Sequence, residues 1–158
     1  MGNKSEGVER ASNLFENGHN CAQSVLMAFC ERYGLDGQMA RKLSSGLGGG
    51  VGRKGDICGA ANGACMVLGL HVCSTPGASE KDIYQAVIAD VQKFLDTFRE
   101  RCGALDCRDL IGFDISTEQG RAEARSQDVF KQRCPGFVRA AAEILEEMIA
   151  GSAADNSK

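Results

Sequence analysis

Hydrophobic residues recur along most of the chain at the spacing of amphipathic helices, and no segment shows the two-residue alternation of a strand. The clearest pattern covers 79–102, where apolar residues follow one another every three or four positions. We therefore expect an all-α fold, a single compact bundle of about six to eight helices over 5–150. A polar, disordered tail is expected over 151–158. The individual helices are predicted at about 5–17, 21–34, 37–43, 56–70, 79–102, 106–111, 117–131 and 135–150.

The predicted helix over 56–70 differs from the others because small residues make up its first half. Gly59 and Gly63 lie four residues apart, a spacing that lets another backbone approach closely. We expect this helix to be central and buried, with Asp56 as its N-cap. A glycine-rich loop over 44–55 precedes it and has little capacity for regular structure.

Composition and charge exclude several classes of protein. The 158 residues carry a net charge of −3 and only 6% aromatic residues, which argues against binding to nucleic acid or to an anionic membrane surface. No apolar run has the length of a membrane span or follows the N-terminus as in a secretory signal, so no membrane insertion and a cytoplasmic protein are expected. Thiols are kept reduced there, and the eight cysteines therefore indicate redox chemistry or metal binding rather than structural disulfides.

The cysteines fall into two groups when they are placed on the predicted helices. At helix N-termini, unpaired backbone N–H groups and the helix dipole favour a thiolate over a thiol. The remaining cysteines are expected inside helices, in a turn or at a helix end, and a buried one there acts as a small hydrophobic residue. The group at helix N-termini is Cys21, Cys58, Cys107 and Cys134. The other group is Cys30, Cys65, Cys73 and Cys102.

The first group coincides with a sequence pattern. Residues 58–63 read CGAANG, and Cys21 precedes this motif whereas Cys107 and Cys134 follow it. In these features the chain resembles the redox-active C-GCAxxG-C-C family, small proteins marked by four cysteines and a CGAxxG motif. The resemblance covers nearly the whole chain and implies redox activity in a bacterial or archaeal protein, without naming a substrate.

The glycine-rich loop permits two interpretations. Residues 50–55 spell GxGxxG, but no strand precedes them, so a dinucleotide site is not indicated. One interpretation is a nest of free N–H groups, with Gly50, Gly52 and Arg53 as candidates for holding an anion or a sulfur atom beside Cys58. The other is that the glycines only let the backbone pass close to the small-residue helix.

The leading functional hypothesis is a thiol oxidoreductase that needs no cofactor beyond its own thiols. Cys58 is expected to be the attacking cysteine, because a helix start, the glycine loop and two cations lie near it in sequence. One of the other three cysteines at helix N-termini would then resolve the mixed disulfide. The redox partner is a protein or a small molecule, and the sequence does not choose between them.

Two alternatives belong to other classes of protein. In the first, the thiolates of Cys21, Cys58, Cys107 and Cys134 hold a zinc ion or an Fe–S cluster in an electron carrier. In the second, the chain is a non-catalytic helical interaction module, such as a homodimer formed through the small-residue helix. No CxxC motif is present, which excludes a thioredoxin-type dithiol.

Overall fold

The computed structural model describes residues 6–155, and these residues form helices and no strand. The all-α prediction is therefore confirmed. The α-helices are α1 (Glu6–Glu16), α2 (Cys21–Phe29), α3 (Gly37–Leu43), α4 (Gly59–Cys73), α5 (Glu80–Cys102), α6 (Cys107–Ile111), α7 (Glu118–Ser126), α8 (Val129–Gln132) and α9 (Cys134–Asp155). Two 3₁₀ turns, η1 (Cys30–Tyr33) and η2 (Ser45–Leu47), complete the list.

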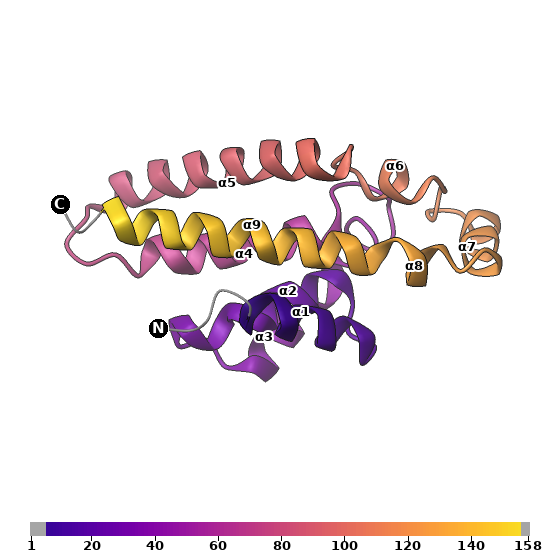
Figure 1. Ribbon diagram of the computed structural model, residues 1–158, viewed down its shortest axis with the longest axis horizontal. Coiled ribbons are helices and arrows are strands. Elements are labelled where there is room, and N and C mark those ends of the chain that lie inside the picture. The colour runs from indigo at the N-terminus through magenta and orange to yellow at the C-terminus, as the bar shows by residue number, and fades with distance from the viewer. Residues whose placement is uncertain (1–5, 156–158) are drawn as a thin grey trace.

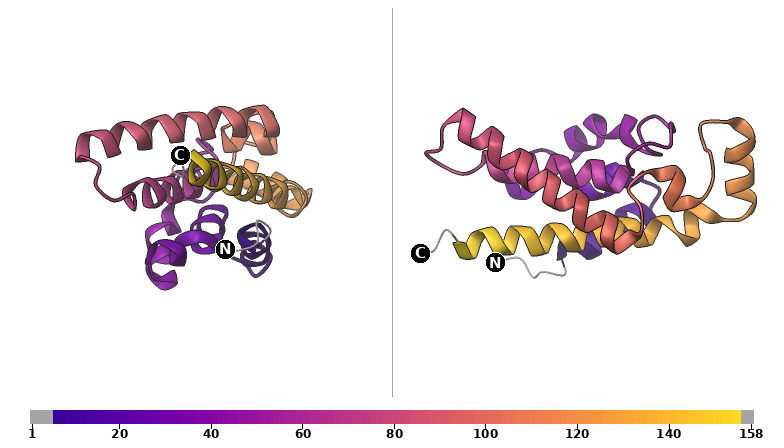
Figure 2. Two further views of the ribbon diagram at one scale, coloured as in Figure 1. Left: turned by 60° about the vertical axis from the view of Figure 1, so that its left-hand side comes forward. Right: turned by 90° about the horizontal axis from the view of Figure 1, so that it is seen from above.

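The helices pack in three layers along the long axis of the molecule (Figure 1). Helices α4 and α9 form the middle layer, α5 covers one side of it, and α1, α2 and α3 cover the other. Figure 2 shows the same arrangement from two further directions. Helices α6, α7 and α8 gather at one end, where α4 and α9 both begin.

The core joins the three layers through fully buried side chains. Leu26 and Phe29 of α2, Leu68 of α4, Phe94 of α5 and Leu145 of α9 each have 0% exposure. Burial of such apolar side chains is the main force that holds the layers together. A second, smaller cluster lies at the end where α6, α7 and α8 gather, and it includes two cysteines.

Small residues let α4 approach α2 at backbone distance. A Cβ atom added at Gly63 would lie 2.6 Å from the Ala22 carbonyl oxygen, and one at Gly59 would lie 3.2 Å from the Cys21 Cβ. The prediction of a central, buried small-residue helix is thus confirmed. The same contact shows that α2 of the same chain covers the Gly59 and Gly63 face of α4, the face on which the homodimer hypothesis was based.

The start of α4 differs from the prediction. Asp56 does not cap the helix; Cys58 is the N-cap, and the helix continues to Cys73, which was expected in a turn. Residues 56–58 are instead extended, because they pair with residues 105–107 around an isolated antiparallel bridge between Ile57 and Asp106. These hydrogen bonds between distant segments of the chain satisfy backbone groups that a longer helix would have used.

Two further boundaries are corrected towards the C-terminus. The predicted helix over 117–131 is interrupted after α7, where Asp128 adopts a left-handed backbone with φ of 52° and α8 begins in a new direction. Helix α9 continues to Asp155, so residues 151–155 are helical although they were expected in the tail. Residues 156–158 of that tail lie outside the described residues.

Candidate functional site

The four cysteines singled out by the sequence all lie at helix starts in the structure. Cys21, Cys107 and Cys134 are the first residues of α2, α6 and α9, and Cys58 is the N-cap of α4. All eight cysteines are free thiols. The fold therefore brings sulfur atoms from widely separated parts of the sequence to one end of the bundle.

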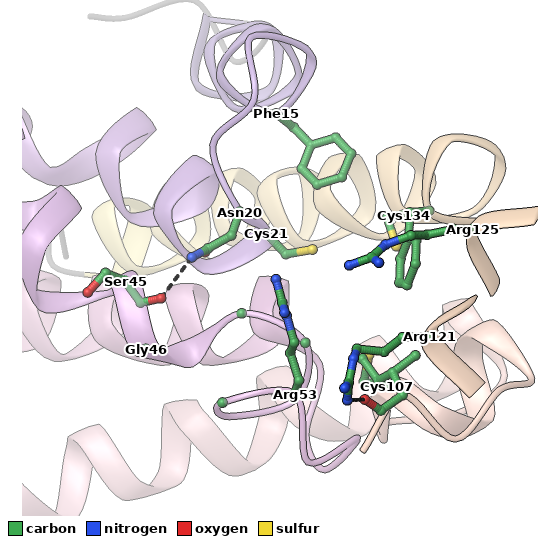
Figure 3. A pocket seen from close by; sticks show the side chains of 15 residues that line it. Phe15, Asn20, Cys21, Ser45, Gly46, Arg53, Cys107, Arg121, Arg125 and Cys134 are labelled. Atoms are coloured by element: carbon green, nitrogen blue, oxygen red, sulfur yellow. Dashed lines mark hydrogen bonds between the residues drawn. The ribbon is translucent and has the colours of Figure 1, made fainter. Parts of the chain in front are cut away.

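A cavity of about 510 Å³ lies at this end (Figure 3). Cys21, Cys107 and Cys134 line it, whereas Cys58 does not and has only 4% exposure. The cavity is thus formed from the starts of α2, α6 and α9 together with the glycine-rich loop and α7. Its lining residues are Phe15, Asn20, Cys21, Ser45, Gly46, Gly48, Gly49, Gly52, Arg53, Cys107, Ile115, Arg121, Arg125, Phe130 and Cys134.

Hydrogen bonds fix the start of α2 and hence Cys21. The Gln23 N–H donates to the Asn20 side chain at 2.9 Å, and the Asn20 N–H donates to the Gln23 side chain at 3.0 Å, which makes a reciprocal capping box. The Asn20 amide also donates to the Ser45 carbonyl at 3.0 Å, as Figure 3 shows. This last bond ties the start of α2 to the loop across the cavity.

A different set of backbone bonds holds Cys58 and Cys107 near each other. The Cys58 N–H donates to the Leu105 carbonyl at 2.9 Å, and the Cys107 N–H donates to the Asp56 carbonyl at 2.7 Å. The side chain of Arg108 adds bonds to the carbonyls of Gly55 and Lys54, at 3.2 and 2.7 Å. The segment before α4 and the start of α6 therefore form one rigid corner beside the cavity.

Cys21 and Cys134 influence each other's acidity. Donation from the Cys21 S–H lowers the pKa of Cys134, because it stabilises the Cys134 thiolate. The same interaction, together with burial and the neighbouring sulfur atoms, raises the pKa of Cys21 well above 9.0. At a given pH the pair therefore loses its first proton from Cys134.

Burial has the opposite effect on Cys58 and Cys107. It raises the pKa of Cys58 to about 11, although the N–H groups of Ala60 and Ala61 at the start of α4 act to lower it. It likewise raises the pKa of Cys107 to about 12, with further contributions from the sulfur atoms of Cys58 and Cys134. The raised pKa of Cys58 speaks against the expectation that Cys58 is the most thiolate-rich cysteine. Desolvation of the anion outweighs the helix-start N–H groups at this position.

In the glycine-rich loop, Gly52 and Arg53, two of the three candidates for the nest of free N–H groups, already donate their N–H groups to carbonyls of η2 and of the loop. The backbone is left-handed from Gly49 through Arg53, with φ between 57° and 67°, and the N–H groups from Val51 through Asp56 all donate to carbonyls of the loop or of η2. A Cβ at Gly50 would collide with the Asp56 backbone, so this glycine permits a close approach within the loop itself rather than to α4. Gly52 and Arg53 line the cavity, and Gly50 does not.

Sequence reasoning missed two arginines of the site. Arg121 and Arg125 lie one helical turn apart on α7 and both face the cavity, in which Arg53 also lies (Figure 3). Their spacing of four residues was the available signal, because it places two side chains on one face of a helix. Nothing in the sequence indicated that this polar face would meet the thiols. Arg121 is anchored by bonds to the carbonyls of Ile115 and Ser116, at 3.0 and 3.1 Å.

The side chains do not fit a metal centre. Within residues 6–155, no group of three or more His, Cys, Asp or Glu side chains is arranged to hold a metal ion. Cys58 is separated from the cavity that the other three cysteines line, so the four sulfur atoms do not face one common space. The hypothesis of a four-cysteine zinc or Fe–S site is therefore not supported.

The fold and the site together define a class: an all-α protein whose cysteines converge at helix starts around a cavity. The chain belongs to the family described as "Putative redox-active protein (C_GCAxxG_C_C)", which matches residues 19–148 and confirms the resemblance seen in the sequence. The chain has no significant match among curated proteins or among solved structures. None of the described helices is long and apolar enough to cross a membrane.

Proposed function

We propose that the protein is a thiol–disulfide oxidoreductase of the cytoplasm whose redox pair is Cys134 and Cys21. The observation that carries this proposal is that both cysteines line one cavity, where the Cys21 thiol lowers the pKa of Cys134 and makes it the more acidic of the two. A thiolate is the nucleophile in thiol–disulfide exchange, and a second thiol beside it can complete the reaction. The family's redox description agrees with this chemistry.

The reaction proceeds in two displacements. The Cys134 thiolate attacks one sulfur of a substrate disulfide, which forms a mixed disulfide and releases the other half as a thiolate that takes up a proton. The Cys21 thiol then loses its proton and attacks the Cys134 sulfur, which forms the Cys21–Cys134 disulfide and releases the second half as a thiol. The substrate gains two electrons, and the protein pair loses two.

The other two family cysteines have a different place in this proposal. Cys58 and Cys107 remain protonated at neutral pH, so neither begins the reaction. Cys107 lines the cavity next to the redox pair, and Cys58 lies buried behind it. The nucleophile that the sequence suggested, Cys58, is thus replaced by Cys134.

The test is a single turnover in a Cys73→Ser background, because the exposed Cys73 would otherwise react first with any reagent. The reduced protein is mixed with one equivalent of bis(2-hydroxyethyl) disulfide, quenched with acid and mapped by peptide mass spectrometry. We expect one disulfide, between Cys21 and Cys134, and a trapped mixed disulfide on Cys134 in the Cys21→Ser variant. A linkage between other cysteines would overturn the assignment. A chain that forms no disulfide would favour the non-catalytic interaction module.

A further inference from the structure

The cavity concentrates positive charge beside the redox pair. Arg53, Arg121 and Arg125 line it, and no Asp or Glu does so. The chain as a whole is acidic, with 21 acidic against 18 basic residues, so this local excess of cations runs against the average composition. Like charges gathered around a cavity repel one another unless an anion joins them.

Two of these arginines are left without a partner inside the protein. Among residues 6–155, Arg53 and Arg125 make no salt bridge and no side-chain hydrogen bond, whereas Arg108 and Arg139 pair with carboxylates elsewhere on the molecule. Figure 3 shows the guanidinium groups of Arg53 and Arg125 on either side of the Cys21 sulfur. Both groups therefore keep their five N–H donors for something that enters the cavity.

The backbone at Arg53 shows that this cation is held in place by the loop. Arg53 is held at a cost, because its φ of 63° is left-handed, a conformation that side chains other than glycine rarely adopt. The loop hydrogen bonds keep it there, with the guanidinium over the cavity.

The remaining lining matches a short carbon chain. Phe15, Ile115 and Phe130 supply apolar surface to the same cavity as the arginines, and the volume of about 510 Å³ is that of a small-molecule site rather than of a protein-docking groove. A ligand that fits these walls has an apolar middle, anionic ends and a sulfur atom within reach of Cys134.

We propose that the cavity binds small organic disulfides whose two ends carry carboxylates or similar anions, with Arg53 and Arg125 holding the ends. This inference rests on the proposed function, since it names the substrate class of the same site. Thiol–disulfide exchange then proceeds as described above: the bound disulfide takes two electrons from Cys134 and Cys21 and leaves as two anionic thiols. Arginine suits this task because its planar fork bonds a carboxylate in two places.

The experiment compares three disulfides that share one core and differ in charge. They are 3,3′-dithiodipropionate, with two negative charges, neutral bis(2-hydroxyethyl) disulfide, and cystamine, with two positive charges. Single-turnover rate constants of the Cys73→Ser protein are each divided by the rate constant of free 2-mercaptoethanol with the same disulfide, which removes intrinsic reactivity. We expect the normalised rate to fall in the order anionic, neutral, cationic, with steps of about tenfold at low salt.

Arginine variants test the cause of this order. Arg125→Gln and Arg53→Gln should each slow the reaction with 3,3′-dithiodipropionate about tenfold and leave the neutral disulfide within about twofold. The matched control is Lys54→Gln, since Lys54 follows Arg53 in the loop but does not line the cavity, and it should change neither rate. Equal normalised rates for the three disulfides, or an equal effect of Lys54→Gln, would refute the inference.

A binding measurement separates this inference from the proposed function. The thioether 3,3′-thiodipropionate has the same two carboxylates but cannot undergo exchange, and its binding to the Cys21→Ser/Cys134→Ser variant is measured by calorimetry. Binding that Arg125→Gln weakens, combined with no exchange in the protein that keeps both cysteines, would support the anion site and overturn the redox assignment. Exchange with no preference for charge would support the redox assignment and overturn the anion site.

Discussion

Cys134 and Cys58 both lie at helix starts, yet their acidities move in opposite directions. Burial dominates at Cys58, where the N–H groups of α4 do not compensate for the loss of water around the anion. At Cys134, donation from the neighbouring Cys21 thiol outweighs burial. A side chain that donates directly to sulfur thus decides which thiol ionises, and the helix start alone does not.

Removing the donor should therefore raise the pKa of Cys134. Hydrogen bonds to charged groups contribute about 1.5–3 kcal/mol, so Cys21→Ala should lower the thiolate fraction of Cys134 near neutral pH about tenfold or more. Cys21→Ser keeps a donor and should restore much of the effect. The measurement is the rate of iodoacetamide alkylation of Cys134 against pH, in the Cys73→Ser background. The midpoint should lie below 9.0 in the parent protein and shift upward in Cys21→Ala; identical profiles in all three proteins would contradict the hydrogen-bond explanation.

At the scale of elements, the CGAANG segment works by bringing two helix starts together. Gly59 and Gly63 let α4 lie against the first turn of α2, and the Asn62 side chain donates to the Ile57 carbonyl at 2.9 Å, which holds the extended segment before α4. The motif therefore serves mainly to pack α4 against α2. It sets the distance between α2 and α4 and so places Cys58 beside Cys21.

Gly63→Ala should destabilise the protein although alanine is the better helix former. The added Cβ would lie 2.6 Å from the Ala22 carbonyl oxygen, and this backbone contact relaxes only by separating α2 from α4. We expect a loss of about 1–3 kcal/mol in the free energy of unfolding by urea.

Gly69→Ala is the matched control, because it lies on the same helix with nothing within 4 Å of the added Cβ. It should gain about 0.5–1 kcal/mol from helix propensity. If both substitutions changed the free energy of unfolding in the same direction, close packing on α2 would not be what Gly63 provides.

For the whole molecule, the parallel starts of α4 and α9 at one end of the bundle determine where the site lies (Figure 1). Each layer contributes to this end: α2 supplies Cys21, α9 supplies Cys134, and the segment after α5 supplies Cys107. The partly buried pair between Arg32 and Glu146, joined by two hydrogen bonds of 3.1 and 2.6 Å, fixes α9 against η1. The redox pair therefore depends on the assembly of the complete bundle.

Global stability should fall at alkaline pH through the buried thiols. Folding raises the pKa of Cys58 from 9.0 to about 11, so its contribution is fully present below pH 9 and is lost as the pH rises to about 11. The unfolding free energy of the parent protein should therefore drop towards that of Cys58→Ala over this range, by up to about 3 kcal/mol.

Urea titrations from pH 7 to 11, without oxygen and with reductant, measure this convergence. Val67→Ala serves as the control because Val67 is fully buried on the same helix and has no titratable group. Its curve should run parallel to that of the parent protein. A Cys58→Ala curve that also stays parallel would show that the Cys58 thiol does not resist ionisation.

Much of the fold was accessible from the sequence because it follows from local pattern. Apolar spacing predicted the helices, and the predicted starts at 21 and 37 are those of α2 and α3, where Asn20 and Asp36 are the N-caps. The start of α4 was misassigned at Asp56, since the bonds that keep this segment extended come from residues about fifty positions away. The break at Asp128 was missed for a similar reason. Aspartate tolerates a left-handed backbone, but its presence in the sequence does not predict one.

The sequence by itself determined that this is a helical protein with four cysteines at helix starts and membership of a redox-active family. Only the tertiary structure decided which cysteine is acidic, which of them meet in the cavity and which arginines join them. The physical reason is that helix formation depends on neighbours along the chain, whereas desolvation, hydrogen bonding between thiols and the gathering of charge depend on residues that only packing brings together.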